Sequence, residues 1–214
     1  MSDQEIYKLL IYIPIGLMTI GVVSGLVRYT SIGKSQRLVL FLMVAALLAE
    51  GCAGVLRKVG PTSYPGFHVY ALIEYVLLIL IYAHFTRKRE SKALLWTLPV
   101  MVLIGVVNVL LFQGWHELNT NVTTVSSTIF IILAAVLFFR MLSEMRYVRI
   151  EKSSLFWINN GVIIYFSTSL LLFIFSATVV EISVEQSLSV WMIHLFVNIV
   201  HYLCFNIALW MDPE

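Results

Sequence analysis

The chain alternates between long apolar segments and short polar ones along its whole length. A helix needs about 20 mostly apolar residues to cross the hydrocarbon core of a bilayer, which is about 30 Å thick. Seven segments are of that length, so the pattern predicts seven transmembrane helices. The predicted spans are residues 9–27, 38–56, 67–85, 93–112, 122–139, 155–180 and 188–211.

The connections between these spans are short and carry turn or charge signals, such as the Gly60-Pro61 pair. Short connections favour sequential helices that pack up and down against each other. We therefore predict an all-α membrane protein in which residues 1–214 form one seven-helix transmembrane domain. The first span follows a polar start and lacks a small-residue cleavage pattern, so we expect it to be retained.

Composition excludes a soluble domain, because 60% of the 214 residues are hydrophobic and only 12% are charged. The net charge of +2 implies no nucleic-acid partner. Cys52 and Cys204 each lie in an apolar segment, where thiols pack well, and form no disulfide framework. The lipid bilayer is therefore the first partner that the sequence predicts.

Basic residues are concentrated in alternate connections. Cytoplasmic loops carry the excess of Lys and Arg, so this asymmetry predicts an outside N-terminus and an inside C-terminus. The basic segment 140–152 is then a candidate contact for a signalling protein in the cytoplasm, although most such charges set topology and attract anionic lipid. Eleven residues lie on the predicted inner side, namely Arg28, Lys34, Arg37, Arg87, Lys88, Arg89, Lys92, Arg140, Arg146, Arg149 and Lys152, against Lys8, Arg57 and Lys58 on the other.

Only two acidic residues, Glu50 and Glu74, lie within the predicted spans, and no Lys or Arg accompanies them there. An ionisable side chain inside a bilayer is costly and usually marks a functional interior. At a rise of 1.5 Å per residue, both glutamates and His194 fall about 10 Å below the outer edge. If the two carboxyl groups face each other, they cannot ionise independently, and His194 would share or receive a proton.

Further polar residues continue this layer or lie close to it. His194, Asn198 and His201 follow the i, i+4, i+7 spacing of one helix face, which we expect to point inward. The sequence therefore predicts a polar pocket in the outer half of the bundle. Its predicted ligand-binding residues are Glu50, Glu74, His194, Asn198, His201, Asn108, Asn160 and Tyr165.

Other residues of the spans have structural interpretations. The Ser and Thr residues of segment 123–128 can bond their own helix backbone or a neighbouring helix. The Gly21-x-x-x-Gly25 motif predicts a close helix contact, either inside the bundle or between protomers of a homo-oligomer. Four aromatic residues lie toward span ends and are read mostly as markers of the membrane interface, namely Tyr70, Tyr75, Trp157 and Trp191.

A metal site is the alternative interpretation of the pocket, because His and Glu side chains are zinc ligands. Glu50, Glu74 and His194 could supply three ligands, with His68 in reserve. His194 and His201 lie about 10 Å apart along one helix, which is too far to bind the same ion. The first interpretation needs no cofactor, whereas this one makes the protein a zinc-dependent intramembrane lipid hydrolase.

Seven spans, an outside N-terminus and polar residues in the last span resemble the superfamily of alkaline ceramidases and progestin and adiponectin receptors. The resemblance implies zinc-dependent lipid amidase chemistry and a His-x-x-x-His pair in the last span. Here Asn198 takes the place of the second histidine after His194, so one implied ligand is missing.

Other seven-helix classes fit less well. Retinal proteins need a lysine in the last span for the Schiff base, and none follows Lys152. The Glu-Met-Arg-Tyr sequence at 144–147 is similar to a motif of G-protein-coupled receptors, but it follows the fifth span instead of the third. Sugar carriers of the SWEET type would show a repeat with Pro-Gln pairs, which is absent; small-solute carriers of other kinds stay open as a third alternative.

Three segments, 68–74 (HVYALIE), 156–167 (FWINNGVIIYFS) and 191–210 (beginning WMIH), resemble uncharacterised bacterial seven-helix membrane proteins associated with signalling genes. The resemblance implies a sensor, ligand-binding or accessory role in the bacterial inner membrane, with no established substrate. Together with the polar residues, it predicts binding rather than catalysis. The ligand would be a small molecule, a lipid head group or a proton, and the change would pass to the cytoplasmic loops or a partner.

Overall fold

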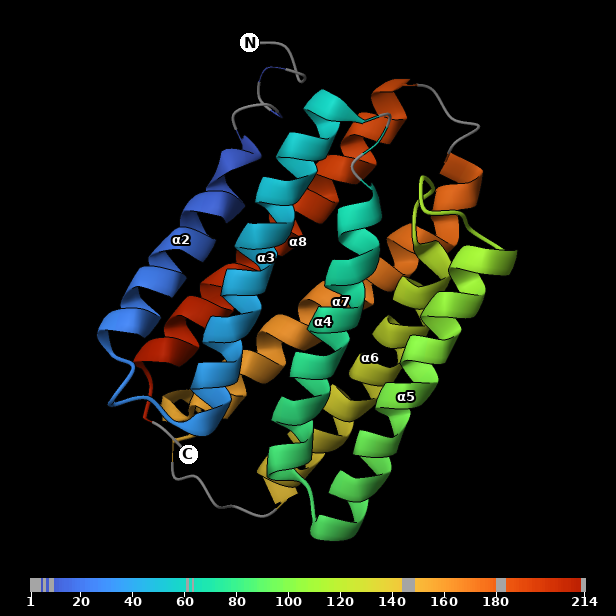
Figure 1. Ribbon diagram of the computed structural model, residues 1–214. Coiled ribbons are helices and arrows are strands. Elements are labelled where there is room, and N and C mark those ends of the chain that lie inside the picture. The colour runs from blue at the N-terminus through green and yellow to red at the C-terminus, as the bar shows by residue number, and fades with distance from the viewer. Residues whose placement is uncertain are drawn as a thin grey trace.

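The computed structural model describes residues 5, 7, 10–60, 62, 64–143, 149–179 and 184–212, with the backbone alone at 174–179 and 184–189. Over these residues the chain forms seven α-helices, and consecutive helices point in opposite directions (Figure 1). The same residues contain no β-strand, only an isolated bridge between Ser153 and Asp212. The helices are α2 (Tyr12–Val27), α3 (Lys34–Val59), α4 (Tyr64–Phe85), α5 (Lys88–Leu111), α6 (Thr120–Ser143), α7 (Ser154–Val179) and α8 (Val184–Trp210), with the short 3₁₀ helix η1 (Ile150–Lys152) before α7.

Six helices of the described chain, α3 to α8, are long and apolar enough to cross a membrane. The prediction of an all-helical, membrane-integral protein is therefore confirmed at this level. Helix α2 corresponds to the first predicted span, but its 16 residues rise only about 24 Å, less than a hydrocarbon core of about 30 Å. Leu9, where that predicted span begins, lies outside the described residues.

Helices α3 and α5 begin four and five residues before the predicted apolar spans, because polar residues satisfy their first backbone donors. Before α3, the backbone N–H of Gly33 donates to Oε1 of Gln36 at 2.7 Å. Before α5, the N–H of Arg87 donates to Oε2 of Glu90 at 3.3 Å. A side chain three residues into a helix commonly caps its start in this way. Hydropathy marks the apolar part of a helix, whereas capping decides where the helix starts.

The helices form a ring in which each contacts its neighbours in sequence, and α8 closes the ring against α2. Helices α3 and α8, and α4 and α6, also touch across the centre. Helix α7 packs extensively on both sides, against α6 and α8. The interior of the ring is filled by large side chains, and its fully buried aromatic residues are Tyr75, Tyr82, Phe130, Phe166 and Phe205.

Helix α5 is less embedded than the other long helices. It packs against α4, but its contacts with α6, the next helix in the chain, are sparse. Large apolar side chains face outward along it, among them Trp96 with 76% and Leu110 with 73% of its surface exposed. Such a surface is stable against lipid hydrocarbon and unfavourable in water.

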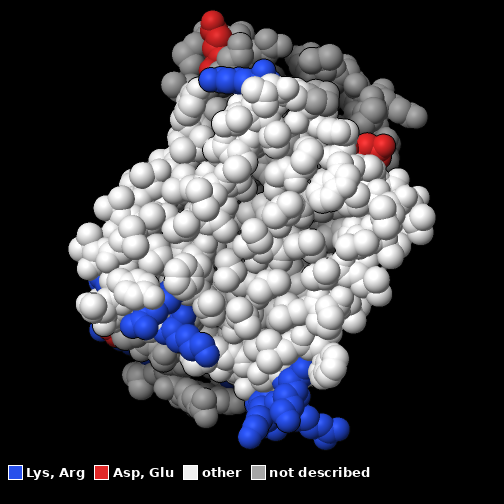
Figure 2. All heavy atoms as spheres, viewed as in Figure 1, with Lys and Arg blue, Asp and Glu red and all other residues white. Residues whose placement is uncertain are grey.

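On the face that Figure 2 shows, the described charged residues gather at the two ends of the molecule, and a broad uncharged belt lies between them. We name the end where α3, α5 and α7 begin the basic end, and the other the opposite end. A bilayer would cover the belt and leave the charges in water. The described basic residues of the basic end are Arg28, Lys34, Arg37, Arg87, Lys88, Arg89, Lys92, Arg140, Arg149 and Lys152, while Arg57 and Lys58 lie at the opposite end and Lys8 and Arg146 lie outside the described residues.

Glycines bring α2 close to α3. A β-carbon at Gly21 would collide with the sulfur of Met43, and one at Gly25 would lie 2.7 Å from a methyl group of Leu40. The sequence left open whether the Gly21-x-x-x-Gly25 motif serves the bundle or a homo-oligomer. In the structure, the motif faces α3 inside the bundle.

Candidate functional site

Glu74 and Tyr70 form a hydrogen-bonded pair on α4. Residues four apart on a helix lie on the same face, and the Tyr70 hydroxyl donates to Oε1 of Glu74 at 3.0 Å. Both side chains are partly buried. Ten residues separate Glu74 from Tyr64, the first residue of α4, so the carboxyl group lies about 15 Å along the helix. The pair therefore places an acidic side chain within the apolar part of the bundle.

Tyrosines of α7 and α8 adjoin this pair. Tyr202 of α8 lies beside the Tyr70 hydroxyl. Tyr165 of α7 is close enough to interact electrostatically with Glu74 and with Tyr202. Glu50 of α3 interacts with the same two tyrosines. We name these five residues the acidic tyrosine cluster; it joins α3, α4, α7 and α8.

Glu50 has different surroundings from Glu74. It is half-buried on α3 and interacts electrostatically with Arg57, which follows it by seven residues near the end of the same helix. The guanidinium group lies outside the predicted span, so the hydropathy pattern gave no sign that it would reach Glu50. Both carboxyl groups share Tyr165 and Tyr202 as neighbours, and Glu50 has a cation in addition.

The two histidines of α8 both lie against Tyr165. The ring centroid of His201 is 4.6 Å from that of Tyr165, and the centroid of His194 is 5.8 Å away. Nδ1 of His201 lies 2.9 Å from the carbonyl oxygen of Gly161; because a carbonyl only accepts, this nitrogen carries the proton. Nδ1 of His194 is buried and has no hydrogen-bond partner among the described residues. Asn198 lies between the histidines on α8 and is half-buried.

The adjacent residues Asn159 and Asn160 have different roles. Asn160, which the sequence assigned to the pocket, donates to the carbonyl oxygen of Phe156 in its own helix at 2.8 Å. Asn159 is fully buried, accepts from the Tyr82 hydroxyl at 2.9 Å and donates to the Ala134 carbonyl at 3.0 Å. Asn159 therefore links α7 to α4 and α6, while Asn160 satisfies its own backbone.

The structure places Asn108 in a separate group of polar residues. Its Nδ2 donates to Asn119 at 3.1 Å and to Gln113 at 3.3 Å, and its Oδ1 accepts from Asn121 at 2.8 Å. Gln113 also bonds Thr120 and the backbone N–H of Asn121. We name these five residues the polar knot. The knot joins the end of α5 to the start of α6, and Asn108 is a member of it.

The residues predicted as zinc ligands do not gather around one point among the described residues. His68 is buried, its Nε2 donates to the Glu117 carbonyl at 3.0 Å, and its ring packs against Trp115. In the part of the chain that the structure describes, no three His, Cys, Asp or Glu side chains lie close enough together to hold a metal ion. The described residues therefore do not assemble the ligand set that zinc chemistry requires.

Tyr70 and Tyr202 are not among the residues predicted from the sequence to line the pocket. Tyr70 lies near the start of its span, which is typical of an interface aromatic, but it precedes Glu74 by four residues. Tyr202 follows Asn198 by four residues on the helix face that carries the histidines. The i, i+4 spacing was thus the signal that could have found both residues.

The chain matches no model of a protein family, and it matches neither a curated protein nor a solved structure.

Proposed function

We propose that this protein is a polytopic membrane sensor or binding protein whose acidic tyrosine cluster takes up a proton or a small polar ligand. The observation that carries the proposal is the Tyr70–Glu74 pair inside an apolar bundle, with Tyr165, Tyr202 and Glu50 around it. An acidic side chain at this depth is costly and is usually retained for a function.

The chemistry of the cluster favours a ligand that donates hydrogen bonds or carries positive charge. Carboxylates accept hydrogen bonds, and phenol hydroxyls both donate and accept them. The buried Nδ1 of His194 is a further polar atom that a ligand or a water molecule could satisfy. A cation or an N–H or O–H group entering the cluster would therefore find several partners.

The position of the cluster supports a signalling role. Its residues come from α3, α4, α7 and α8, so protonation or ligand binding changes interactions among four helices at once. Packed helices transmit such changes as small shifts along their length. The basic end, at the far end of these helices, is the surface that a partner would detect.

The proposal also includes the topology and the location of the protein. It crosses the bacterial inner membrane seven times, with its N-terminus outside. In this orientation Glu50 and Glu74 lie nearer the outer end of their helices and the basic end faces the cytoplasm. The resemblance to bacterial proteins associated with signalling genes supports a partner at segment 140–152, of which residues 144–148 lie outside the described chain.

The unfolding temperature of the detergent-purified protein, measured across a pH series, tests the proposal. We expect the wild type to show a step in stability that Glu74→Gln lacks, because the amide still accepts from Tyr70 but cannot titrate. Tyr70→Phe removes the hydrogen bond to Glu74 and should displace the step. Glu117→Gln, which changes an exposed carboxylate in the α5–α6 connection, is the matched control and should follow the wild type.

The same assay then screens small amines and polyols, which carry positive charge or donate hydrogen bonds. A ligand that binds only the folded state at 100 times its Kd stabilises it by about 2.7 kcal/mol, and Glu74→Gln should abolish that gain. If Glu74→Gln retains both the pH step and the response to ligand, the cluster is not the binding site. A Glu74→Gln protein that fails to fold would give the glutamate a packing role instead.

A further inference from the structure

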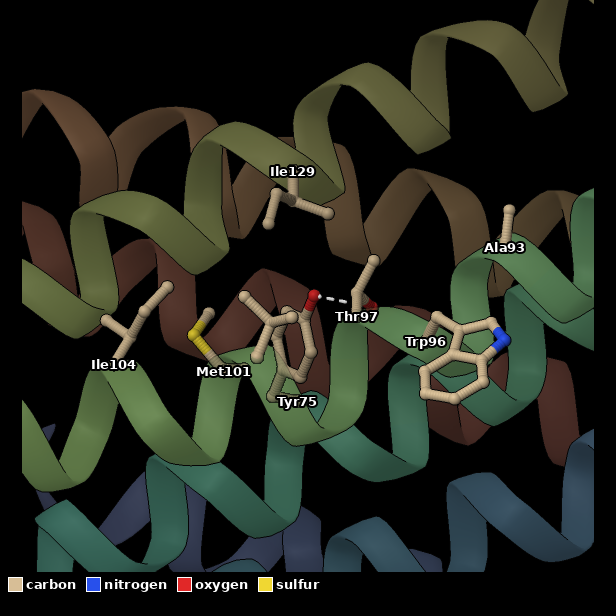
Figure 3. Close-up of a pocket in the computed structure, with 8 residues that line it drawn as sticks. Tyr75, Ala93, Trp96, Thr97, Met101, Ile104 and Ile129 are labelled. Atoms are coloured by element: carbon tan, nitrogen blue, oxygen red, sulfur yellow. Dashed lines mark hydrogen bonds between the residues drawn. The ribbon is translucent and has the colours of Figure 1, made fainter.

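A narrow apolar groove lies between α4, α5 and α6 (Figure 3). It is lined by Tyr75 of α4, Ile129 of α6 and the face of α5 that runs from Ala93 to Ile104. The Tyr75 hydroxyl donates to Thr97 at 2.9 Å, so the polar atoms of the two side chains satisfy each other. The volume of about 240 Å³ is below the roughly 300–1,000 Å³ of pockets for drug-sized ligands. The groove therefore suits a slender apolar chain.

The groove exists because α5 and α6 are held together near their ends and make few contacts between them. At the basic end, the guanidinium of Arg140 on α6 donates to both carboxylate oxygens of Glu90 on α5, at 2.8 and 2.9 Å. At the opposite end, the polar knot joins the two helices. The space between these attachments is the groove, which lies in the uncharged belt of the molecule.

The length of the groove matches one leaflet of a bilayer. The rise from Ala93 to Ile104 is about 16 Å, and half of a hydrocarbon core is about 15 Å. Trp96 and Val100, which also line it, are strongly exposed on the outside of α5. An acyl chain in the adjacent leaflet can therefore enter from the side along most of its length.

Two basic residues lie just beyond the groove, on the same side of α5 and toward the basic end. Arg89 precedes Ala93 by four residues and Lys92 precedes Trp96 by four, so each lies one turn nearer the basic end on the same side of α5. Both side chains are exposed. They lie where the phosphate of a lipid would be if its chain occupied the groove.

We propose that the groove binds one acyl chain of an anionic phospholipid from the leaflet at the basic end, with Arg89 and Lys92 holding the phosphate. The groove favours an acyl chain because it is apolar, lies at the depth of the membrane and is as long as one leaflet. The two cations favour a negatively charged head group. This site is separate from the acidic tyrosine cluster and does not depend on the function proposed for it.

Photo-crosslinking in phosphatidylcholine vesicles tests the proposal, with a phosphatidylglycerol probe that carries a diazirine on one acyl chain. We expect labelled wild-type peptides to map to segment 93–104 and to Ile129. Val100→Trp fills the groove and should reduce this labelling by about tenfold, which corresponds to a tenfold loss of affinity for the probe. Val102→Trp places the same ring on the exposed side of α5 that does not line the groove and should label as the wild type does.

A phosphatidylcholine probe with the same diazirine tests the head group. The wild type should prefer the anionic probe, and the Arg89→Gln, Lys92→Gln double variant should lose that preference. The Arg57→Gln, Lys58→Gln double variant removes the same charge at the opposite end and should keep it. Wild-type labelling spread evenly over α5 would overturn the groove site, and equal labelling by the two probes would overturn the role of the cations.

Discussion

Several polar side chains inside this bundle are paired with particular partners on neighbouring helices. Asn159 is the clearest case, because it is fully buried and bonds the Tyr82 hydroxyl and the Ala134 carbonyl. The hydrocarbon region offers no water to replace a lost partner, so an unpaired polar group there is costly. Such a residue therefore determines which helices face each other.

A double-mutant cycle measures this pairing. We expect Asn159→Leu and Tyr82→Phe each to lower the free energy of unfolding, because each leaves the other residue without its partner. The double variant should cost less than the sum, with a coupling between about 0.6 kcal/mol, the average measured for such bonds between membrane helices, and about 1.7 kcal/mol, the largest. Unfolding in a denaturing-detergent titration gives the values.

Asn160 supplies the control for this cycle, because it bonds the backbone of its own helix. Asn160→Leu combined with Tyr82→Phe should be additive. Additive behaviour of Asn159 and Tyr82 as well would contradict the interhelical bond.

At the scale of the helices, two kinds of contact fix how the helices of the acidic tyrosine cluster pack. One is close approach of two backbones at a glycine, and the other is capping of a helix end by a side chain of another helix. Helices α7 and α8 approach at Gly161, where a β-carbon would lie 3.1 Å from Cβ of Cys204 and 3.3 Å from the His201 carbonyl oxygen. The same glycine accepts the hydrogen bond from Nδ1 of His201. The distance between these helices therefore sets the orientation of a ring that packs on Tyr165.

Gly161→Ala should lower the free energy of unfolding by about 1–3 kcal/mol, the usual cost of adding volume to a packed contact. Gly16→Ala is the matched control, because no atom outside the backbone of its own helix lies within 4 Å of the added β-carbon. This substitution should stabilise the helix by about 0.4–1 kcal/mol. Thermal unfolding in detergent measures both. Equal effects of the two substitutions would mean that α7 and α8 do not approach closely at Gly161.

The last turn of α8 is capped by α3. Gln36 is fully buried and donates to the carbonyl oxygens of Ala208 at 2.8 Å and Met211 at 3.0 Å. The final carbonyls of a helix have no partner inside it, so this amide replaces the missing donors. One side chain thereby holds the start of α3 against the end of α8.

Gln36→Leu should lower the free energy of unfolding by about 1–3 kcal/mol, because buried carbonyls lose their donors. Gln36→Glu keeps an acceptor for the N–H of Gly33 but cannot donate when ionised, so it should not rescue stability. Thermal unfolding of the two variants is the measurement. Wild-type stability of Gln36→Glu would show that the donated bonds contribute little.

At the scale of the whole molecule, an uncharged belt separates two charged ends (Figure 2). The excess of Lys and Arg lies at the basic end, so the orientation of the protein follows from which end stays in the cytoplasm. Both ends offer exposed residues for labelling, such as Ser31 between α2 and α3 and Glu117 between α5 and α6.

Labelling with a membrane-impermeant maleimide tests the orientation in a variant without Cys52 and Cys204. Glu117→Cys should react in intact bacterial cells, whereas Ser31→Cys should react only after lysis, because the basic end is expected inside. The opposite pattern would reverse the proposed orientation and place Glu50 and Glu74 nearer the cytoplasmic end of their helices.

Part of the candidate site was predictable from the sequence and part was not. Glu50, Glu74, His194, His201 and Tyr165 stood out because ionisable and polar residues are rare in apolar segments, and the structure brings each of the other four near Tyr165. Depth along a span gave their level but not the direction in which each side chain points. Asn108, for example, has a similar predicted depth but belongs to the polar knot.

The sequence alone determined the helical class, the approximate positions of the apolar helices and the charge difference between the ends, because these depend on local hydropathy and on charge along the chain. Apart from α8, whose polar residues mark one face, tertiary structure alone decided the rotation of each helix about its axis. Helices that are apolar all round carry no periodic stripe to mark an inward face. Packing therefore selected Tyr70 and Tyr202 as neighbours of the glutamates and left a groove beside α5, neither of which hydropathy could specify.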